Sequence, residues 1–405
     1  MDQMDALSGI RVVDFSMGAA GPWAADQLAL MGAEVIKVES RQHPEIMRII
    51  LDPVTRQPQS PDRSLLFEVV NSNKLSVTLD LTRPEAVELA KRLVGVSDVV
   101  VESFSPGIMK RFGLDYDVLR AVNPSLVMLS CSAAGQSGPE AQSLGLAPLF
   151  SAMGGLGHMT GYVDGPPSEI RFTIDMMVAL ANAVALLAAL NHRRETGVGQ
   201  HIDMSSREAM SCLIGDSLMD FTMNGRVQSR TGNRDDVMAP HNCYRCQGED
   251  SWVSIAVGSG QEWEALCGSI GRPELVTDSR FADAALRWQN QEEIDRIVEA
   301  WTVNRTSYEV MNALQPAGVA AVPSFSAEQL FTDPHLAEQD LTTVVEHPEL
   351  GAVVMLNPAW KLSETPARIT RHSPLLGEHN DYVLGELLGL SAEERARLKS
   401  RKIVA

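Results

Sequence analysis

Short apolar runs alternate with helical segments through the first 130 residues, and this alternation constrains the fold more than any other feature of the chain. The runs, each the length of a buried strand, are Ile10 to Phe15, Val35 to Val38, Leu75 to Leu79, Val99 to Val101 and Leu126 to Ser130. Trp23 to Met31 and Pro84 to Val94 have helical patterns between them. We therefore predict an α/β fold with a Rossmann-like parallel sheet covered by helices.

The chain has 405 residues, more than one compact core usually supports, so we expect a second, smaller domain. A glycine-rich stretch over 135–165 precedes a long apolar helix that follows Asp175. A strand over Gln200 to Met204 and a helix over Ser205 to Met223 come next. Residues 225–236 have the composition of a linker, and residues 237–322 contain a further set of strands and helices. The tail ends in helices around 381–388 and 391–398.

Charge and composition restrict the partners. A net charge of -18 and a pI near 4.9 argue against nucleic acid and against an anionic membrane surface. The longest apolar run, Met176 to Leu190, is shorter than a membrane span and contains Asn182, which favours a buried helix. The first residues carry no secretory pattern, and five cysteines without framework spacing fit a reducing compartment. We expect a cytoplasmic protein.

Two local motifs suggest other sites only weakly. Cys243 and Cys246 form a lone CxxC in a segment with strand character, without the second ligand pair that zinc needs, so no metal site is predicted. The loop Ser16 to Pro22 contains glycines after the first strand but lacks the GxGxxG spacing. A nicotinamide dinucleotide site at this loop stays open as an alternative.

Basic residues gather where the loops after the first strands should converge. They are Lys37, Arg41, Lys74, Lys110 and Arg111. Ligands of open parallel sheets bind beyond the carboxyl ends of the strands, and phosphates need cationic partners. This group predicts a phosphate-bearing ligand, although a solvated basic face would have the same composition.

The chain resembles the class III coenzyme A transferases, the CaiB/BaiF type that includes formyl-CoA transferase and the carnitine CoA-transferases. The similarity runs nearly end to end. The matching motifs are Leu7 to Phe15, Ala20 to Pro22, Met31 to Glu39, Asn71 to Lys74, Asp98 to Glu102, Gly135 to Pro139, Asp164 to Pro167, Thr196 to Gln200 and Pro374 to Asn380.

The resemblance implies that Asp175 is the catalytic nucleophile, since it stands before the long helix that leads to the Thr196 to Gln200 turn. It implies transfer of CoA from an acyl-CoA donor, with succinyl-CoA as one candidate, to a carboxylic acid through a mixed anhydride and an aspartyl-CoA thioester. A helix N-terminus steadies an anion, which suits this role. Capping of the helix by the same side chain is the simpler alternative.

The resemblance also implies a CoA site with no permanently bound cofactor. The matching positions are Ala19, Ala20, Arg41, Asn71, Ser72, Asn73, Lys74, Ser103, Phe104, Ser105 and Arg111. Ala19, Ser103 and Ala147 depart from residues of formyl-CoA transferase, which disfavours formyl and oxalyl substrates. Backbone amides of Gly154 to Gly157 are expected to stabilise oxyanions, an expectation from glycine content.

Within this family, racemases carry a His-Asp pair that would fall at Leu146 and Ala147, neither of which can transfer a proton. A CoA-binding subunit that is silent without a paralogous partner is a third possibility. Leu144, Leu146, Ala147 and Met176 suggest a hydrophobic pocket for an aryl-substituted or branched acid. The resemblance further implies an interlocked homodimer, a large domain of residues 1–222 and 324–405, and a small α+β domain of residues 223–323.

Overall fold

The computed structural model describes residues 5–51, 56–57, 60–170 and 172–404, and the chain forms two compact units. The first unit comprises Met1–Gly157, Glu169–Arg226 and Glu338–Ala405, and the second comprises His158–Ser168 and Val227–Ala337. The large unit thus combines amino-terminal and carboxyl-terminal parts of the chain. The segment His158–Ser168 belongs to the small unit, an assignment that the predicted boundaries at 223 and 323 did not include.

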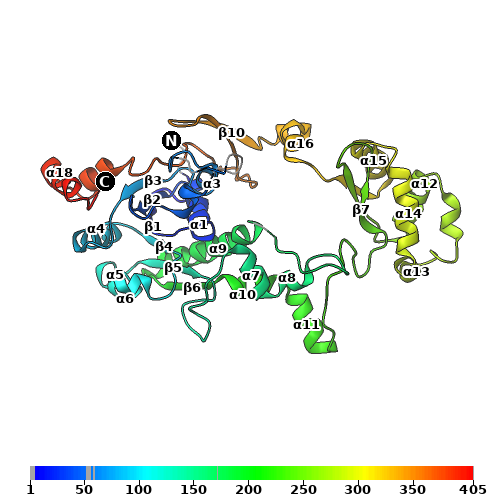
Figure 1. Ribbon diagram of the computed structural model, residues 1–405, viewed down its shortest axis with the longest axis horizontal. Coiled ribbons are helices and arrows are strands. Elements are labelled where there is room, and N and C mark those ends of the chain that lie inside the picture. Colours follow the sequence, from blue (N-terminus) through cyan, green and yellow to red (C-terminus); the bar gives the residue numbers. More distant parts are fainter. Residues whose placement is uncertain (1–4, 52–55, 58–59, 171, 405) are drawn as a thin grey trace. The chain divides into compact units, whose positions relative to one another are not determined.

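A six-stranded parallel sheet forms the centre of the first unit, with the order β3-β2-β1-β4-β5-β6 (Figure 1). Its strands are β1 (Arg11–Asp14), β2 (Glu34–Glu39), β3 (Leu75–Thr78), β4 (Val99–Glu102), β5 (Val127–Ser132) and β6 (His201–Ser205). The strand order reverses between β1 and β4. Loops that leave these two strands diverge at their carboxyl ends, which is where open α/β sheets bind ligands.

Both faces of the sheet are covered, which explains why its central strands β1, β2 and β4 are rich in buried valine and isoleucine. On one face, Val12 and Val99 pack against α1 (Ala20–Leu30) and α9 (Thr173–Thr196). On the other face, Val13 and Val100 pack with α4 (Pro84–Gly95) and with the carboxyl-terminal segment. The predicted α/β class and the Rossmann-like parallel sheet are confirmed.

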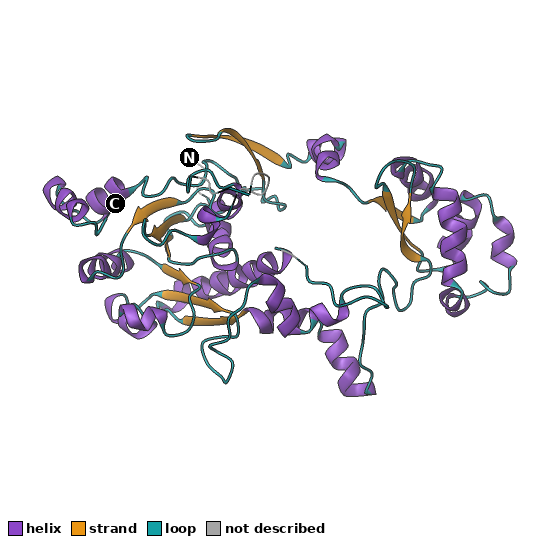
Figure 2. Ribbon diagram, viewed as in Figure 1, coloured by secondary structure: helices purple, strands orange, loops and turns teal. Residues whose placement is uncertain are grey.

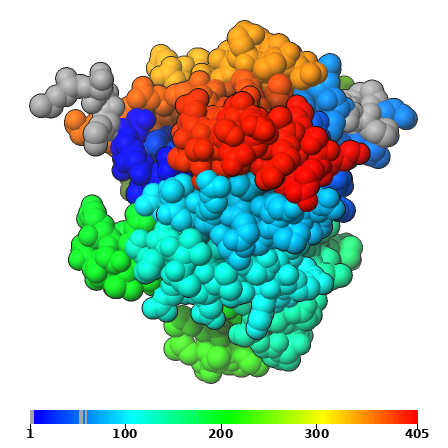
Figure 3. Space-filling model, turned by 90° about the vertical axis from the view of Figure 1, so that its left-hand side faces the viewer, coloured from blue at the N-terminus to red at the C-terminus, as the bar shows by residue number. Residues whose placement is uncertain are grey.

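The carboxyl-terminal segment completes this second face. It contains the π-helical turn η3 (Tyr382–Leu387) and α18 (Ala392–Ser400), whose buried residues join the core around β2 and β3. The backbone amide of Asp80, just after β3, donates to the carbonyl of Ile403 over 3.0 Å. Figure 3 shows this segment, in red, lying against the blue and cyan first part of the chain.

The remaining elements of the first unit are short helices and one hairpin (Figure 2). The helices are α2 (Ile46–Ile49), α3 (Leu65–Val70), α5 (Ile108–Phe112), α6 (Tyr116–Val122), α7 (Ala147–Gly154), α10 (Ser206–Leu213) and α11 (Gly215–Asn224). Strands β10 (Thr342–His347) and β11 (Gly351–Leu356) pair antiparallel. The single helix predicted over 205–223 is two helices, which are separated at Ile214.

The second unit is an α+β structure around a three-stranded antiparallel sheet of order β7-β8-β9. Its strands are β7 (His241–Arg245), β8 (Trp252–Ala256) and β9 (Ala320–Pro323). Its helices are α8 (Leu156–Met159, whose first residues belong to the first unit), α12 (Gly260–Ser269), η1 (Pro273–Thr277), α13 (Ala284–Gln289), α14 (Gln291–Thr302), α15 (Ser307–Leu314), η2 (Gln315–Ala317), α16 (Ala327–Thr332) and α17 (Pro334–Glu338). Val253, Ile255 and Trp263 lie in its separate hydrophobic core.

Helix α9 is the longest helix of the described chain and holds Asp175 in its first turn. With 24 residues it is longer than the apolar run that predicted it, and by length and composition alone it could cross a membrane. Core helices of globular proteins share this property. Its buried side chains, which include Val178, Leu186 and Leu190, pack in the interior of the first unit.

Candidate active site

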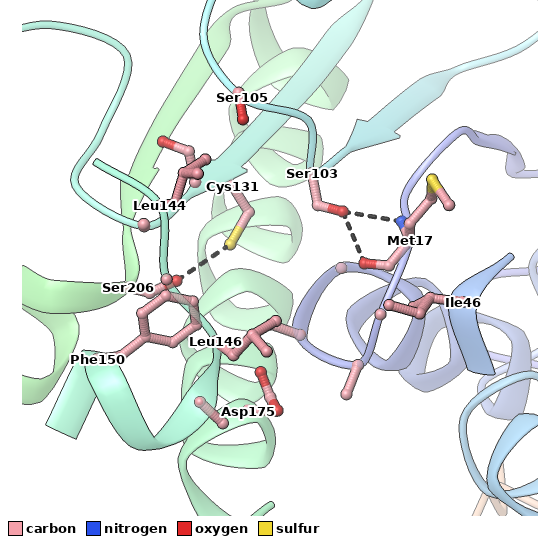
Figure 4. Close-up of a pocket in the computed structure, with 18 of the residues that line it drawn as sticks. Met17, Ile46, Ser103, Ser105, Cys131, Leu144, Leu146, Phe150, Asp175 and Ser206 are labelled. Carbon is pink, nitrogen blue, oxygen red and sulfur yellow. Dashed lines mark hydrogen bonds between the residues drawn. The ribbon is translucent and has the colours of Figure 1, made fainter. Parts of the chain in front are cut away.

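A cavity of about 460 Å³ lies at the carboxyl ends of β1 and β4, where the strand order reverses. Its walls include the segment Met17 to Gly21, which leads from the loop after β1 into α1, the loop Ser103 to Pro106, the segment Ser143 to Pro148 and the start of α9. Further lining residues are Ile46, Met47, Ile50, Cys131, Ser132, Ala133, Ala141, Phe150 and Ser206. Figure 4 shows Asp175 beside Leu146 in this cavity. Asp175 is the one charged residue among the described residues that line it.

Asp175 occupies the third position of α9, whose N-cap is Phe172. No described residue donates a hydrogen bond to its carboxylate, so the structure does not assign it the role of helix cap that the sequence left open. Burial raises its pKa from 3.8 to about 6. A carboxylate that is partly desolvated and free of hydrogen-bond partners retains its nucleophilicity, and the N-terminus of α9 favours its ionised form.

The segment Met17 to Gly21 packs closely against Ser16, just after the end of β1, and against the loop after β4. A Cβ atom at Gly21 would lie 2.5 Å from Cβ of Ser16 and 3.2 Å from Cβ of Ser103, so only glycine fits. The Ser103 hydroxyl accepts from the Met17 amide at 2.8 Å and donates to the Met17 carbonyl at 2.9 Å. The amide of Gly18 donates to the buried carboxylate of Glu45. Contacts with Ser16, Ser103 and Glu45 therefore fix the position of this wall of the cavity.

A second cavity of about 180 Å³ adjoins the same strand ends. Met17 and Phe104 line both cavities, so the two lie on either side of these residues. The second cavity is further lined by residues that follow β2 and β3 and by the short helix α5. These are Ser40, His43, Leu79, Asp80, Leu81, Thr82, Ile108 and Phe112, among others. Together the cavities border the carboxyl ends of β1 to β4.

Five of the predicted CoA-contacting residues line the first cavity: Ala19, Ala20, Ser103, Phe104 and Ser105. The structure does not bring Asn71, Ser72, Asn73 or Lys74 to either cavity. These four precede β3, whereas the cavities border the carboxyl ends of the strands. Their side chains bond to protein groups instead, with Ser72 donating to Asp26 at 2.8 Å and Asn73 to the Arg368 carbonyl at 2.8 Å.

Lys74 differs most from its prediction as a phosphate ligand. It is fully buried, and its ammonium donates to the Asp14 carboxylate at 2.8 Å, the Pro22 carbonyl at 2.6 Å and the Asn71 amide oxygen at 2.8 Å. An ammonium has three donors, so none is left for a phosphate in this structure. Asn71 is likewise fully buried.

The two predicted arginines are exposed. Arg111 lies on α5, the helix whose Ile108 and Phe112 line the second cavity, and no described carboxylate pairs with it. Arg41 borders a separate polar cavity of about 380 Å³ together with Arg395 and Lys399. Both arginines follow strands at the ligand-binding edge of the sheet, so they remain available for an anionic ligand.

Of the other residues predicted to belong to the site, some line the first cavity and some do not. Leu144, Leu146 and Ala147 line the first cavity, with Leu144 and Leu146 exposed by 83% and 69%. Met176 does not line it. The Gly154 to Gly157 amides, expected to stabilise oxyanions, are also not in its wall, because Gly154 packs against Met210 of α10 instead.

The CxxC pair carries no metal cluster among the described residues. Cys243 lies on β7 near the Ser324 hydroxyl, and Cys246 is buried after the strand ends. Several residues that line the cavities were not predicted from the sequence, and two of these contributors lie in the second cavity. These are Glu45 and the Leu79 to Thr82 segment. The position of the latter directly after an apolar run was the signal that could have indicated it, since ligand sites follow strands.

The fold and the cavity define an α/β enzyme with a single carboxylate in an apolar pocket at the switch point of its sheet. The chain belongs to CoA-transferase family III, whose family model matches residues 7–380. It is 34% identical over 399 residues to succinyl-CoA--D-citramalate CoA-transferase of Chloroflexus aurantiacus, covering 98% of each chain. It is 35% identical to the alpha subunit of succinyl-CoA--L-malate CoA-transferase from the same organism, covering 98% of this chain and 92% of the relative.

Solved structures agree with this assignment. A CaiB/BaiF family protein from Brucella suis superposes with a TM-score of 0.85 at 30% identity, covering 95% of this chain and all of the other. The predicted family and the predicted enzyme class, CoA-transferase, are therefore confirmed.

Proposed function

We propose that this enzyme transfers CoA from succinyl-CoA to a carboxylic acid, with Asp175 as the nucleophile that carries the acyl group. The observation that carries the proposal is the isolated Asp175 carboxylate in the apolar cavity at the carboxyl ends of β1 and β4. Succinyl-CoA as donor is supported by the names of two relatives, the D-citramalate and L-malate CoA-transferases.

The proposed reaction begins when the Asp175 carboxylate attacks the thioester carbonyl. The C–S bond breaks, CoA leaves as a thiolate, and a mixed anhydride of Asp175 and succinate forms. The thiolate then attacks the aspartyl carbonyl, which releases succinate and leaves an aspartyl-CoA thioester. The acceptor carboxylate then attacks the aspartyl-CoA thioester, which releases the CoA thiolate and forms a mixed anhydride of Asp175 and the acceptor. The thiolate attacks the acceptor carbonyl of this anhydride, which gives the CoA ester of the acceptor and regenerates Asp175. The thioester energy is conserved because each step transfers the acyl group to a carboxylate or a thiolate and not to water.

The arrangement of the two cavities supports one orientation of CoA. The thioester would lie near Asp175 in the larger cavity, and the pantetheine arm would pass Met17 and Phe104 toward the smaller one. The nucleotide would then lie over Leu79 to Thr82, with Arg111 on the adjacent helix α5 as a phosphate partner. In this proposal Leu79 to Thr82 take the place that the sequence interpretation gave to Asn71 to Lys74.

We propose an acceptor with an apolar, aryl-substituted or branched body. Leu144, Leu146 and Phe150 line the cavity, and the only charge among its described residues is the nucleophile itself. An apolar substituent gains roughly 25 cal/mol per Å² of surface removed from water against such a wall.

The racemase alternative receives no support from the cavity. Epimerisation at an α-carbon needs an acid and a base on opposite sides of that carbon. Leu146 and Ala147 line the cavity at the positions where the sequence comparison placed the racemase pair, and neither ionises. His158 does not line the cavity.

We propose that a second copy of the chain, or a paralogous subunit, covers the exposed apolar side chains of α9 and those of α11. Exposed hydrophobic side chains on these helices are Met177, Leu180, Val184, Leu218, Met219, Phe221 and Met223. Monomeric proteins rarely leave so many large apolar side chains exposed to water. One relative is named as an alpha subunit, which makes a heteromer plausible as well as the interlocked homodimer. Light scattering of the purified chain would give the mass of the assembly.

The proposed function is tested by mixing the protein with succinyl-CoA and a pool of carboxylic acids that includes aryl, branched and hydroxylated members. New CoA esters are detected by mass spectrometry, with Asp175→Ala as the control. An ester that forms with the wild type and not with the variant supports the proposal and names the acceptor. Activity that appears only when a paralogous subunit is added would favour the heteromer.

A further inference from the structure

Three charged side chains without contact to solvent lie beneath the loop that separates the two cavities. Asp14 ends β1, Lys37 lies opposite it on β2, and Lys74 precedes β3. All three are fully buried, and both ammonium groups approach the same carboxylate oxygen, Lys74 at 2.8 Å and Lys37 at 3.5 Å. We call these residues the buried triad.

Each lysine of the triad also donates a hydrogen bond to the backbone at one end of the segment Met17 to Gly21, which leads from the loop after β1 into the first turn of α1. Lys37 donates to the carbonyl of Ser16 at 2.8 Å, and Lys74 donates to the carbonyl of Pro22 at 2.6 Å. The residues between these two anchors, Met17 to Gly21, all line the first cavity. Asp14 contributes directly, because one of its oxygens accepts from the amide of Ser16 at 2.9 Å.

Burying three charges is expensive, and replacement by apolar residues of similar volume is often neutral or stabilising. The pKa of Asp14 shows how the charges are maintained: burial alone would raise it, but Lys37 and Lys74 together with hydrogen bonds lower it to about 2. Both ammonium groups therefore act on the ionised Asp14 carboxylate, and Lys74 also acts on the buried carboxyl of Asp26, whose pKa burial raises to about 7. If these residues served only to stabilise the fold, apolar side chains could do so without the free-energy cost of burying charges.

We infer that Lys37 and Lys74 are positioning residues that fix the segment Met17 to Gly21, the end of the loop after β1 and the start of α1, against the acyl-CoA, and that neither contacts the CoA phosphates. This inference rests on the proposed CoA-transferase function, and it extends that function to residues outside the cavity. Loops without such anchors sample several conformations, and a displacement of about 1 Å at a reacting centre can reduce a rate by about 100-fold.

The test uses Lys74→Met, which removes the anchor at Pro22 and leaves Lys37 paired with Asp14. Lys37→Met removes the anchor at the other end and serves as the second variant if the first fails to fold. Lys91→Met, on the surface of α4 and paired with Glu88, is the matched control. Melting temperatures establish that each variant is folded before any other measurement.

The first readout is hydrogen–deuterium exchange of peptides that cover residues 15–23, which does not depend on turnover. We expect exchange in this segment to be about tenfold faster in Lys74→Met, and unchanged in Lys91→Met and in peptides from the second unit. Unchanged exchange over 15–23 in a folded Lys74→Met protein would overturn the inference. Because no substrate is involved, this result is independent of whether the proposed function is correct.

The second readout compares succinyl-CoA with succinyl-pantetheine, which lacks the nucleotide and all phosphates. A positioning role predicts that Lys74→Met lowers kcat/KM by a similar factor, about tenfold or more, for both thioesters. A loss confined to succinyl-CoA would assign Lys74 to a phosphate and overturn the inference. Arg111→Ala provides the opposite pattern for comparison, since its loss is expected with succinyl-CoA alone.

Discussion

The hydroxyl of Ser103 forms two hydrogen bonds with the backbone of Met17, one to the amide at 2.8 Å and one to the carbonyl at 2.9 Å (Figure 4). This side chain therefore joins the loop after β4 to the loop after β1, the two loops that diverge at the switch point of the sheet. Both loops line the cavity that contains Asp175. The shape of the cavity thus depends on a contact between segments 86 residues apart.

Replacing Ser103 with alanine should lower kcat/KM by about 5- to 20-fold and the free energy of unfolding by about 1 kcal/mol, because two hydrogen bonds to the loop are lost. Ser103→Thr retains the hydroxyl and should recover most of the activity. Ser105→Ala, which changes a neighbouring serine of the same cavity without such bonds, is the control. Equal activities of the Ser103→Ala and Ser105→Ala variants would contradict this role.

Gly21→Ala should destabilise the protein by about 1–3 kcal/mol and reduce transfer activity, because the new methyl group would overlap Ser16 and displace the loop. Urea denaturation measures the change in stability. Gly260→Ala, where a Cβ atom meets nothing within 4 Å, provides the matched substitution and should be nearly neutral. If both substitutions have the same effect, the loop tolerates displacement and the packing argument is wrong.

The activity should depend on the ionisation of Asp175, whose pKa burial raises to about 6. Only the ionised carboxylate attacks the thioester, so kcat/KM should fall about tenfold for each pH unit below the pKa and reach a plateau above it. Binding of CoA measured calorimetrically over the same pH range separates this effect from ionisation of the CoA phosphates. A flat profile between pH 5 and pH 7, which brackets the pKa by about one unit on each side, would argue against Asp175 as the nucleophile.

Asp175→Asn should abolish transfer and at the same time stabilise the fold at neutral pH. The folded protein binds the Asp175 proton more tightly than the unfolded chain, so stability falls as the pH rises from the ordinary pKa of 3.8 through about 6. After allowance for partial exposure to solvent, the gain at pH 7 should be about 1–2 kcal/mol. Thermal unfolding at pH 4 and pH 7 checks the sign: the difference from wild type should be small at pH 4 and larger at pH 7. A variant less stable than the wild type at pH 7 would show that Asp175 stabilises the fold.

Much of the fold was predictable because buried parallel strands have a direct sequence pattern. The run Val35 to Val38 lies within β2 (Glu34–Glu39), and Pro84 to Val94 within α4 (Pro84–Gly95). The break at Ile214 was not predictable from periodicity, since Gly215 in a helical pattern is tolerated as often as it ends a helix.

The site was predictable in part. Resemblance indicated Asp175, and the rule that ligands bind after strands indicated the loops at Ala19 and Ser103. The place of Lys74 could not be read from the sequence, because a lysine beside a strand has the same pattern whether its ammonium reaches solvent or a buried carboxylate. Asp14 decides between these outcomes because its carboxylate accepts from the Lys74 ammonium, and Asp14 and Lys74 are 60 positions apart in the sequence.

The central claim, that Asp175 carries CoA covalently, is tested most directly by trapping the intermediate. The protein is incubated with succinyl-CoA in the absence of an acceptor acid, quenched in acid, digested and analysed by mass spectrometry. We expect a peptide that contains Asp175 with CoA attached as a thioester, sensitive to hydroxylamine and absent from Asp175→Ala. A variant Asp175→Ala that still converts an acceptor to its CoA ester, or a wild-type adduct on another residue, would contradict it.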